Sequence, residues 1–192
     1  MTSLGSLCVF CGSAANQSHT EAAKDLGRSA AERGIEIVYG GGRVGLMGVV
    51  AEAALDAGGR VFGVIPEFLQ RREVEYADIT ELLVVETMHT RKRLMFERAD
   101  AFCVLPGGLG TLDETIEIVT WRQLGLHDKP VFLLNLDGFW DPFLTLLQHQ
   151  VAAGYVHREN LALITPVDSV EALFEAAATA PPPWLDDRGE RT

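Results

Sequence analysis

Short apolar runs alternate along the chain with longer stretches in which apolar side chains recur every three or four positions. The runs have the length and nearly continuous apolar character of strands buried on both faces, and they occupy 7–10, 35–39, 61–65, 82–85, 101–105 and 131–135. The longer stretches predict amphipathic helices at about 19–33, 46–57, 140–153 and 170–178. Gly34, Gly58 and Gly154 follow three of these segments, where glycine commonly ends a helix.

Strands that alternate with helices in this way predict an α/β fold, a Rossmann-like parallel sheet with helices on both faces. Residues 1–179 are expected to form a single domain, and the proline-containing segment 180–192 a flexible C-terminal tail. Residues 66–78 are expected to be a polar connection. Ligands bind such sheets beyond the carboxyl ends of the strands, so the turns that follow the strands are the places to look for chemistry.

A glycine-rich turn at 106–114 (PGGLGTLDE) follows the apolar run at 101–105 and opens a helical pattern that continues to Leu124. Glycines let the backbone approach a ligand closely, and the first turn of a helix presents N–H groups with a partial positive charge. This combination is typical of an anion site, most often a phosphate cradle. Thr111 adds a hydroxyl group to it.

Glu114 has two interpretations. Residues 111–114 match the capping box, in which a glutamate at the third helical position bonds back to the N-cap amide. Capping boxes are common, and for this tetrapeptide alone that is the simpler explanation. The preceding glycines favour a ligand site instead, in which the carboxylate would face the group that carries the phosphate.

A second turn, at 40–45 (GGGRVG), fits the GxGxxG spacing of a dinucleotide site, with Glu67 near the expected acidic position. A nicotinamide-dependent oxidoreductase is therefore one alternative. Such a fingerprint usually follows the first strand of a fold, whereas a complete strand–helix unit precedes it here. A turn that lines a ligand, and a turn that lets a helix pack tightly on the sheet, are the other two explanations.

Three basic residues, Arg91, Lys92 and Arg93, stand at the start of a helical segment. Cations at this position oppose the helix dipole unless an anion is close. The run can be a solvated surface, as charge clusters often are, or it can face the ligand edge, where the planar fork of Arg91 suits a phosphate or a base edge. His89 could carry a proton, although a lone histidine is more often structural.

The net charge of −11 argues against nucleic acid as a partner, because phosphate neutralisation needs clustered Lys and Arg. No apolar run approaches the roughly 20 residues needed to span a bilayer, and residues 1–12 lack the features of a signal peptide. Cys8 and Cys11 spell CxxC, but in a strand they would point to opposite faces, so buried thiols are expected. We therefore expect a cytoplasmic protein without disulfides, acting neither on nucleic acid nor on a membrane.

Three motifs together resemble the LOG ("lonely guy") family. They are PGGxGTxxE at 106–114, MHxRK at 88–92 and GGGxxGLMG at 40–48. Family members are cytokinin riboside 5′-monophosphate phosphoribohydrolases, long labelled lysine decarboxylases. The similarity runs from about residue 7 to residue 166, and Asp113 stands where plant members often have glutamate.

The resemblance implies a Rossmann-like homodimer that hydrolyses the N-glycosidic bond of a nucleoside 5′-monophosphate, either a cytokinin riboside 5′-monophosphate or AMP. The products would be free base and ribose 5-phosphate, and neither metal nor cofactor would be required. Arg91 and Glu114 are implied as the catalytic pair. Residues implied for substrate binding are Glu73, Met88, Lys92, Gly107, Gly108, Gly110, Thr111 and Thr120.

Two other functions compete with this one. A non-catalytic nucleotide carrier or sensor could use the same cradle, and it would tolerate Gln at position 114. Decarboxylation with pyridoxal phosphate needs a Schiff-base lysine, and the chain offers only Lys24, Lys92 and Lys129. We therefore do not expect a decarboxylase.

Overall fold

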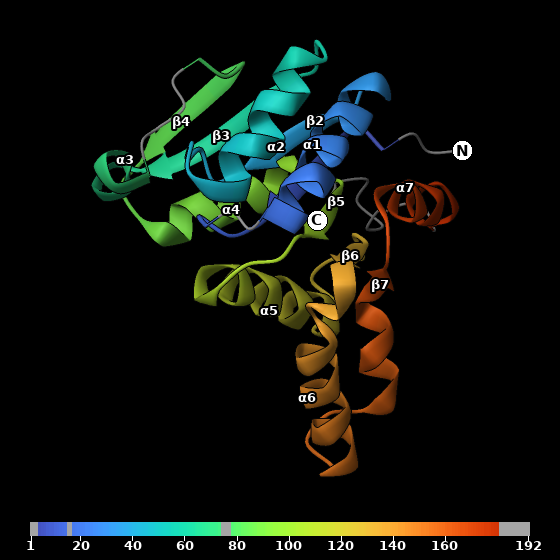
Figure 1. Ribbon diagram of the computed structural model, residues 1–192. Helices are drawn as coiled ribbons and strands as arrows, with labels where there is room; N and C mark the ends of the chain where they lie inside the picture. The colour runs from blue at the N-terminus through green and yellow to red at the C-terminus, as the bar shows by residue number, and fades with distance from the viewer. Residues whose placement is uncertain (1–3, 15–16, 74–77, 181–192) are drawn as a thin grey trace, which may run out of the picture.

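In the residues that the structure describes, seven strands pair side by side, all in parallel, in the order β4-β3-β2-β1-β5-β6-β7 (Figure 1). The computed structural model describes residues 4–14, 17–73 and 78–180. The strands are β1 (Ser6–Phe10), β2 (Glu36–Tyr39), β3 (Val61–Pro66), β4 (Glu81–Val85), β5 (Ala101–Val104), β6 (Val131–Leu134) and β7 (Thr165–Val167). The predicted Rossmann-like parallel sheet is confirmed.

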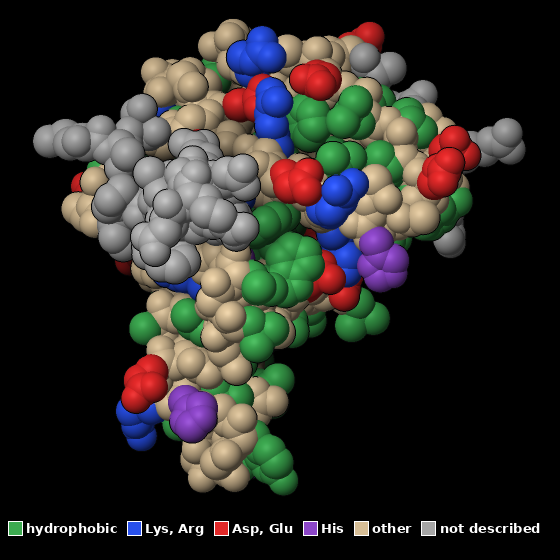
Figure 2. Space-filling model, turned by 180° about the vertical axis from the view of Figure 1, so that it is seen from behind, with side chains coloured by type: hydrophobic (Ala, Val, Ile, Leu, Met, Phe, Trp, Pro, Cys, Tyr) green, Lys and Arg blue, Asp and Glu red, His purple; other side chains and the backbone are tan. Residues whose placement is uncertain are grey.

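Helices cover both faces of the sheet. They are α1 (Gln17–Glu32), α2 (Gly45–Asp56), α3 (Glu67–Glu73), α4 (Met88–Arg98), α5 (Leu109–Gln123), α6 (Asp141–Ala152) and α7 (Val170–Thr179), with short 3-10 segments η1 (Leu136–Gly138) and η2 (Arg158–Leu163). In Figure 1, α6 and the segment that follows it extend away from the sheet as an arm. Figure 2, from behind, shows hydrophobic side chains gathered close to where this arm meets the body.

The alternation of side chains along β1 divides the core into two layers. Leu7 and Val9 pack in one layer, with residues of α1, α2 and α7. Cys8 and Phe10 pack in the other, with Met95 of α4 among their neighbours. Because side chains along a strand point alternately to opposite faces, near-continuous apolar strands are what a sheet covered on both faces requires.

The order of the strands reverses at β1, which lies between β2 and β5. The loops that leave β1 and β5 are joined there by main-chain hydrogen bonds, from the Gly12 amide to the Pro106 carbonyl (3.1 Å) and from the Leu105 amide to the Phe10 carbonyl (2.9 Å). A reversal of this kind opens a crevice at the carboxyl ends of the strands, which is the usual ligand site of open α/β sheets. The turn at 106–114 begins beside it.

Two details differ from the sequence prediction, and a third is not tested. Helix α3 occupies part of the expected polar connection at 66–78, because seven residues are too few to display a helical period. The last strand, Thr165–Val167, is not among the predicted apolar runs. The expected tail at 180–192 lies outside the described residues from 181 onward.

An ion-pair network joins strand and helix at the opposite, amino end of the sheet. The Glu36 carboxylate accepts hydrogen bonds from Arg98 Nε (2.7 Å) and Nη2 (3.1 Å) and from Arg60 Nε (3.3 Å). The hydrogen bonds from Arg98 outweigh the effect of burial and hold the pKa of Glu36 below its ordinary value. Since Arg98 belongs to α4, the network fixes the far end of the helix that carries Arg91.

We predict that Glu36→Gln lowers the free energy of unfolding by about 1 kcal/mol at pH 7, a modest value because Arg98 is partly exposed. A carboxyl whose folded pKa is depressed stabilises the protein above its unfolded pKa, and this contribution is lost as the pH falls through the folded pKa. The gap between variant and wild type should therefore close below about pH 4. Urea titrations across this range measure it.

Glu171→Gln is the matched control, because Glu171 also pairs with an arginine, Arg33, but its side chain is 68% exposed. We expect Glu171→Gln to change the free energy of unfolding little at any pH. If the difference in the free energy of unfolding between Glu36→Gln and wild type stayed constant from pH 7 to pH 3, the Glu36 carboxylate would not be the source of this stability.

Candidate active site

A cavity of about 260 Å³ lies at the carboxyl end of β1 and β5. Its walls come from the loop after β1, the starts of α2, α4 and α5, and α3. The lining residues are Cys11, Gly12, Ser13, Met47, Leu69, Met88, Arg91, Gly108, Leu109, Gly110, Thr111, Asp113 and Glu114. The lining therefore combines apolar side chains with glycines, one arginine and two acids.

Helix α5 opens directly onto this cavity. Its N-cap is Gly108, and its first intrahelical hydrogen bond runs from the Leu112 amide to the Gly108 carbonyl (3.0 Å). The earlier N–H groups of the first turn have no acceptor within the helix. A Cβ added at Gly108 or Gly110 would meet nothing within 4 Å in the described part of the chain, so no atom of those residues requires glycine at either position. Both residues leave open space in front of the amides.

Gly107 has a different reason to be glycine. A Cβ there would lie 2.1 Å from Thr111 Oγ1 and 2.9 Å from the Gly12 amide nitrogen. Gly107 therefore lets the start of α5 pack against the β1 loop, and it is absent from the cavity lining.

The capping-box interpretation of Glu114 is wrong. Because the helix begins at Leu109, Thr111 is its third residue and not its N-cap. Thr111 is buried, and its Oγ1 has no hydrogen-bond partner in the described part of the chain. Glu114 falls in the second turn, where it is half-buried and lines the cavity beside Asp113.

Arg91 is only 5% exposed, although it lines the cavity. Its Nη2 donates a hydrogen bond to the Gly40 carbonyl (3.0 Å), and its Nη1 lies 3.8 Å from the Met88 sulfur. Helix α4, which carries both side chains, is capped by Thr87, whose side chain accepts from the Thr90 amide (3.1 Å). A buried guanidinium held in this way is a fixed positive charge at the cavity wall.

The charges of Arg91 and Glu114 both act on the buried thiol of Cys8. Burial raises the pKa of Cys8 well above its ordinary value, Glu114 raises it further, and Arg91 acts in the opposite direction. Cys8, on β1, thus lies within the electrostatic reach of both cavity residues. Its thiol stays neutral, which excludes it as a nucleophile at physiological pH.

Lys92 points across the rim rather than into the cavity. Its Nζ lies 3.2 Å from Asp113 Oδ2 and 3.0 Å from Glu117 Oε2, so it ties α4 to α5. Burial lowers the pKa of Lys92, but the hydrogen bonds to Glu117 and Asp113 outweigh it and leave the pKa raised. Lys92 carries a full positive charge beside the start of α5.

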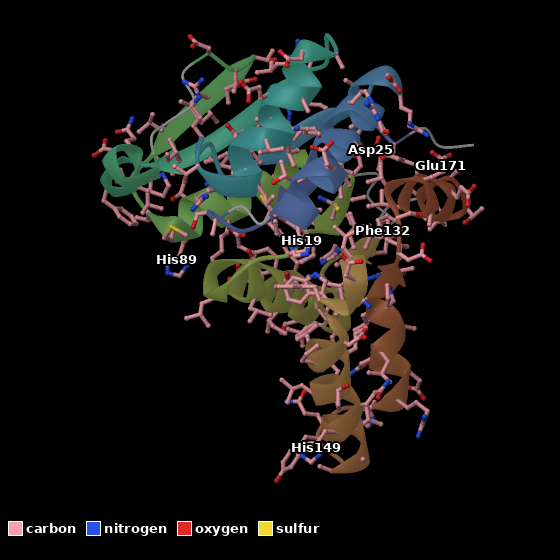
Figure 3. The ribbon with its side chains drawn as sticks, in the orientation of Figure 1. His19, Asp25, His89, Phe132, His149 and Glu171 are labelled. Atoms are coloured by element: carbon pink, nitrogen blue, oxygen red, sulfur yellow. The ribbon has the colours of Figure 1, made fainter. Side chains whose placement is uncertain are left out.

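The neighbours of this lysine face solvent. Arg93 is exposed and pairs with Glu97 one turn along α4 (3.5 Å). His89 is exposed at the start of α4, and Figure 3 shows its side chain directed away from the body of the molecule. Neither Arg93 nor His89 lines the cavity.

Two residues implied by the family resemblance lie elsewhere. Glu73 ends α3, and its side chain falls outside the described part of the structure. Thr120 is exposed on α5, beyond the cavity lining. Trp121 packs edge-on against Phe96 (ring centroids 5.1 Å apart), as expected of a core residue.

Several lining residues were not singled out from the sequence as site residues. Cys11 and Ser13 follow β1, whose carboxyl end is a place where a ligand is expected, so their position was a usable signal. Met47, Leu69 and Leu109 carry no such signal, since apolar residues at the start of a helix usually belong to the core. None of the three cysteines forms a disulfide; Cys8 and Cys103 are buried, whereas Cys11, which was expected to be buried, is half-buried.

The turn at 40–45 is packed against protein. Gly41 (φ +77°) and Gly45 (φ +62°) adopt backbone conformations that favour glycine. A Cβ on Gly45 would lie 2.2 Å from the Ser13 carbonyl carbon, and one on Gly48 would lie 2.0 Å from the Arg43 oxygen. The glycines of this motif therefore serve tight packing of α2 on the loops, rather than a dinucleotide cradle.

The residues do not fit pyridoxal phosphate. Lys24 pairs with Glu21 (2.8 Å), Lys92 is engaged as described, and Lys129 is buried, with its Nζ donating to the Phe96 carbonyl (2.7 Å). None of these three ammonium groups lines the cavity. Within the described ranges, no group of His, Cys, Asp and Glu side chains is placed to hold a metal ion.

Known proteins share this fold. The chain superimposes on the molybdenum cofactor carrier protein of Chlamydomonas reinhardtii with a TM-score of 0.70, at 19% identity, covering 92% of this chain and 98% of that one. The molybdenum cofactor binding protein of Rippkaea orientalis gives a TM-score of 0.69 at 21% identity, with 93% and 98% covered. At such identities the likeness concerns the fold alone.

Relatives found by sequence are more similar to this chain than these structural neighbours are. Residues 47–177 match the family model described as possible lysine decarboxylase. The chain is 47% identical over 169 residues to the cytokinin riboside 5′-monophosphate phosphoribohydrolase LOG of Oryza sativa subsp. japonica, covering 87% of this chain and 70% of that protein. It is 45% identical over 171 residues to LOG2 of Arabidopsis thaliana, covering 88% and 80%. Since this similarity spans most of both chains and includes the turn, the arginine and the glutamate that meet at the cavity, the chain belongs to the LOG family.

Proposed function

We propose that this protein hydrolyses the N-glycosidic bond of a purine ribonucleoside 5′-monophosphate, either a cytokinin riboside 5′-monophosphate or AMP. Free base and ribose 5-phosphate are the products. The observation that carries the proposal is the meeting of Arg91 and Glu114 in one cavity, directly beside the open first turn of α5. The names of the sequence relatives support the same reaction.

The phosphate is proposed to bind at the start of α5. The amides of the first turn carry a partial positive charge, and the bare glycines at 108 and 110 leave room for an anion in front of them. The Thr111 hydroxyl, which is buried without a hydrogen-bond partner among the described residues, can turn toward a phosphate oxygen. Lys92 adds positive charge at the rim.

Glu114 is proposed to act on the sugar. Cleavage of a glycosidic bond passes through an oxocarbenium-like state, which a nearby carboxylate stabilises electrostatically. The same carboxylate can orient the attacking water. As the water oxygen bonds to C1′, the C1′–N9 bond breaks, the purine leaves with the electron pair, and a proton is transferred to the base.

Arg91 is proposed to stabilise negative charge, on the departing purine or on the phosphate. Its pKa is far above neutral, so it is a poor proton donor. Its guanidinium is buried, which strengthens its effect on a charge that develops nearby. Met88, beside it, is proposed to contact the substrate. Glu73 is proposed as a further substrate contact.

A homodimer is proposed through the outer face of α5. Leu109 (86% exposed), Ile116 (42%) and Leu124 (66%) lie along one side of the helix, with Thr120 between the last two. Exposed apolar side chains in such a row favour association with a second apolar surface. Leu109 also lines the cavity, so the ligand would lie next to this interface, and Thr120 would belong to it.

None of the helices in the described ranges is both long and apolar enough to cross a membrane. We propose a cytoplasmic location, which is supported by the finding that none of the three cysteines forms a disulfide. We also propose that neither nucleic acid nor a membrane is a partner, because the net charge of −11 opposes binding to polyanions.

We predict that Glu114→Gln lowers turnover of AMP and of isopentenyladenosine monophosphate by about 10²-fold or more, while nucleotide binding is retained. The substitution keeps the shape of the side chain but removes its negative charge. Release of free base gives the rate, and calorimetry gives the affinity. Glu175→Gln, on α7, is the control. A carrier or sensor would be indicated if the wild type bound nucleotide without releasing base.

We predict that Arg91→Ala lowers turnover by about 10²-fold to 10³-fold, because a buried charge aimed at the reacting groups is lost. Arg93→Ala is the matched control, since Arg93 is two residues away on the same helix but exposed and paired with Glu97. Initial rates of base release should fall only in the first variant. Equal rates for both would remove Arg91 from the catalytic pair.

We predict that Ile116→Glu combined with Leu124→Glu converts a dimer into a monomer, because charged side chains oppose burial of this face. Light scattering after gel filtration measures the mass. Val84→Glu, on the edge strand β4, removes another exposed apolar side chain and should leave the dimer intact. A dimer that persisted in the double variant would place the interface elsewhere.

A further inference from the structure

We propose that Gly40 is a positioning residue for Arg91. Its missing side chain forms the slot in which the guanidinium lies, and its carbonyl oxygen holds the guanidinium there. The inference rests on the proposed function in so far as Arg91 acts on the substrate. It gives the first glycine of the 40–48 motif a role that does not involve a dinucleotide.

The geometry at Gly40 is specific. Gly40 follows β2 at the carboxyl edge of the sheet and is buried. Arg91 Nη2 lies 3.0 Å from its carbonyl oxygen, a charge-assisted hydrogen bond in a buried setting. A Cβ added at Gly40 would lie 1.8 Å from the same Nη2 and 3.0 Å from Arg91 Cζ. An alanine at position 40 and the observed guanidinium cannot occupy this space together.

Among the residues that the structure describes, Arg91 alone comes closer than ordinary van der Waals contact to a Cβ added at this position. Gly40 is not among the residues with positive φ, unlike Gly41 and Gly45, so an L-residue fits its backbone. The three atoms nearest to the added Cβ are Nη2, Cζ and Nε, all from Arg91. At Gly45 and Gly48, in contrast, the nearest atoms belong to the backbone. The constraint at Gly40 is therefore the arginine alone.

This arrangement predicts an unusual phenotype for Gly40→Ala. The obstructing atoms are the end of a flexible side chain, so the fold should survive while the guanidinium moves away from the carbonyl. Arg91 is 5% exposed, which leaves its head group little space other than the cavity itself. Displacing a catalytic group by about 1 Å can reduce a rate about 10²-fold.

The first experiment is a double-mutant cycle on release of base from AMP and isopentenyladenosine monophosphate. It compares wild type, Gly40→Ala, Arg91→Ala and the double variant. We expect kcat of Gly40→Ala to fall about as far as that of Arg91→Ala, and the double variant to be no slower than Arg91→Ala. If Gly40→Ala keeps wild-type kcat, or slows the reaction further in the Arg91→Ala background, the inference is wrong.

Gly5→Ala is the matched control. Its added Cβ would also meet the end of a side chain, Asp100 Oδ2 at 3.0 Å, but at the amino end of the sheet. We expect kcat of Gly5→Ala to lie within about twofold of wild type, since it leaves the cavity untouched. Thermal midpoints of both glycine variants should stay close to wild type.

The second experiment does not depend on activity. The Nε–Hε resonance of Arg91 is identified by its absence from the NMR spectrum of Arg91→Ala. We expect it to shift in Gly40→Ala and to stay in place in Gly5→Ala. An unshifted resonance in Gly40→Ala overturns the positioning role even if turnover falls. If the wild type releases no base, the proposed function fails, while this spectrum still decides whether Gly40 positions Arg91.

Discussion

The pairing of β1 with β5 is the constraint on which the site depends. The strand order reverses at this pair. The connections that follow β1 and β5 therefore run to opposite sides and leave a crevice between them. Main-chain hydrogen bonds between the loops, among them Gly12 to Pro106, fix the start of α5 against the β1 loop. Gly107 makes that contact close enough to aim the open first turn of α5 at the cavity. The proposed phosphate site is thus a consequence of sheet topology.

The arrangement of charge around the cavity follows from helix α4. One helix places Arg91 in the interior and Lys92 on the rim, where Lys92 pairs with Asp113 and Glu117 of α5. Adjacent residues on a helix point about 100° apart, which explains how neighbouring cations take such different positions. The acids on α5 anchor Lys92 beside the cavity. In a chain with a net charge of −11, the cavity thus holds one buried cation, Arg91, with a second, acid-paired cation, Lys92, close to its edge.

Sequence reasoning identified the fold and singled out the turn that lines the cavity, because both rest on local patterns. Apolar runs predicted the parallel sheet, and the PGGxGTxxE segment predicted the glycine turn at its carboxyl edge. It failed where the deciding contact is not local. The sequence at 111–114 matches a capping box, but the N-cap of the helix is Gly108, three residues earlier. Leu69 lines the cavity from α3, a helix too short for its period to be recognised in the sequence. Glycine itself is ambiguous in a sequence, since Gly110 faces open space and Gly45 faces backbone.

The fold does not determine the reaction. Proteins named as molybdenum cofactor carrier or binding proteins share this fold at 19% and 21% sequence identity, and a shared fold does not imply a shared function. Hydrolysis requires more than a binding site for the nucleotide. It also needs a negative charge that stabilises the oxocarbenium-like sugar and a positive charge that stabilises the departing base or the phosphate. In the proposed mechanism, Glu114 and Arg91 supply these two charges from different helices, and Arg91 lies where a side chain at position 40 would collide with it. The proposed chemistry therefore rests on a few side chains and one missing side chain, placed on a scaffold that other proteins share.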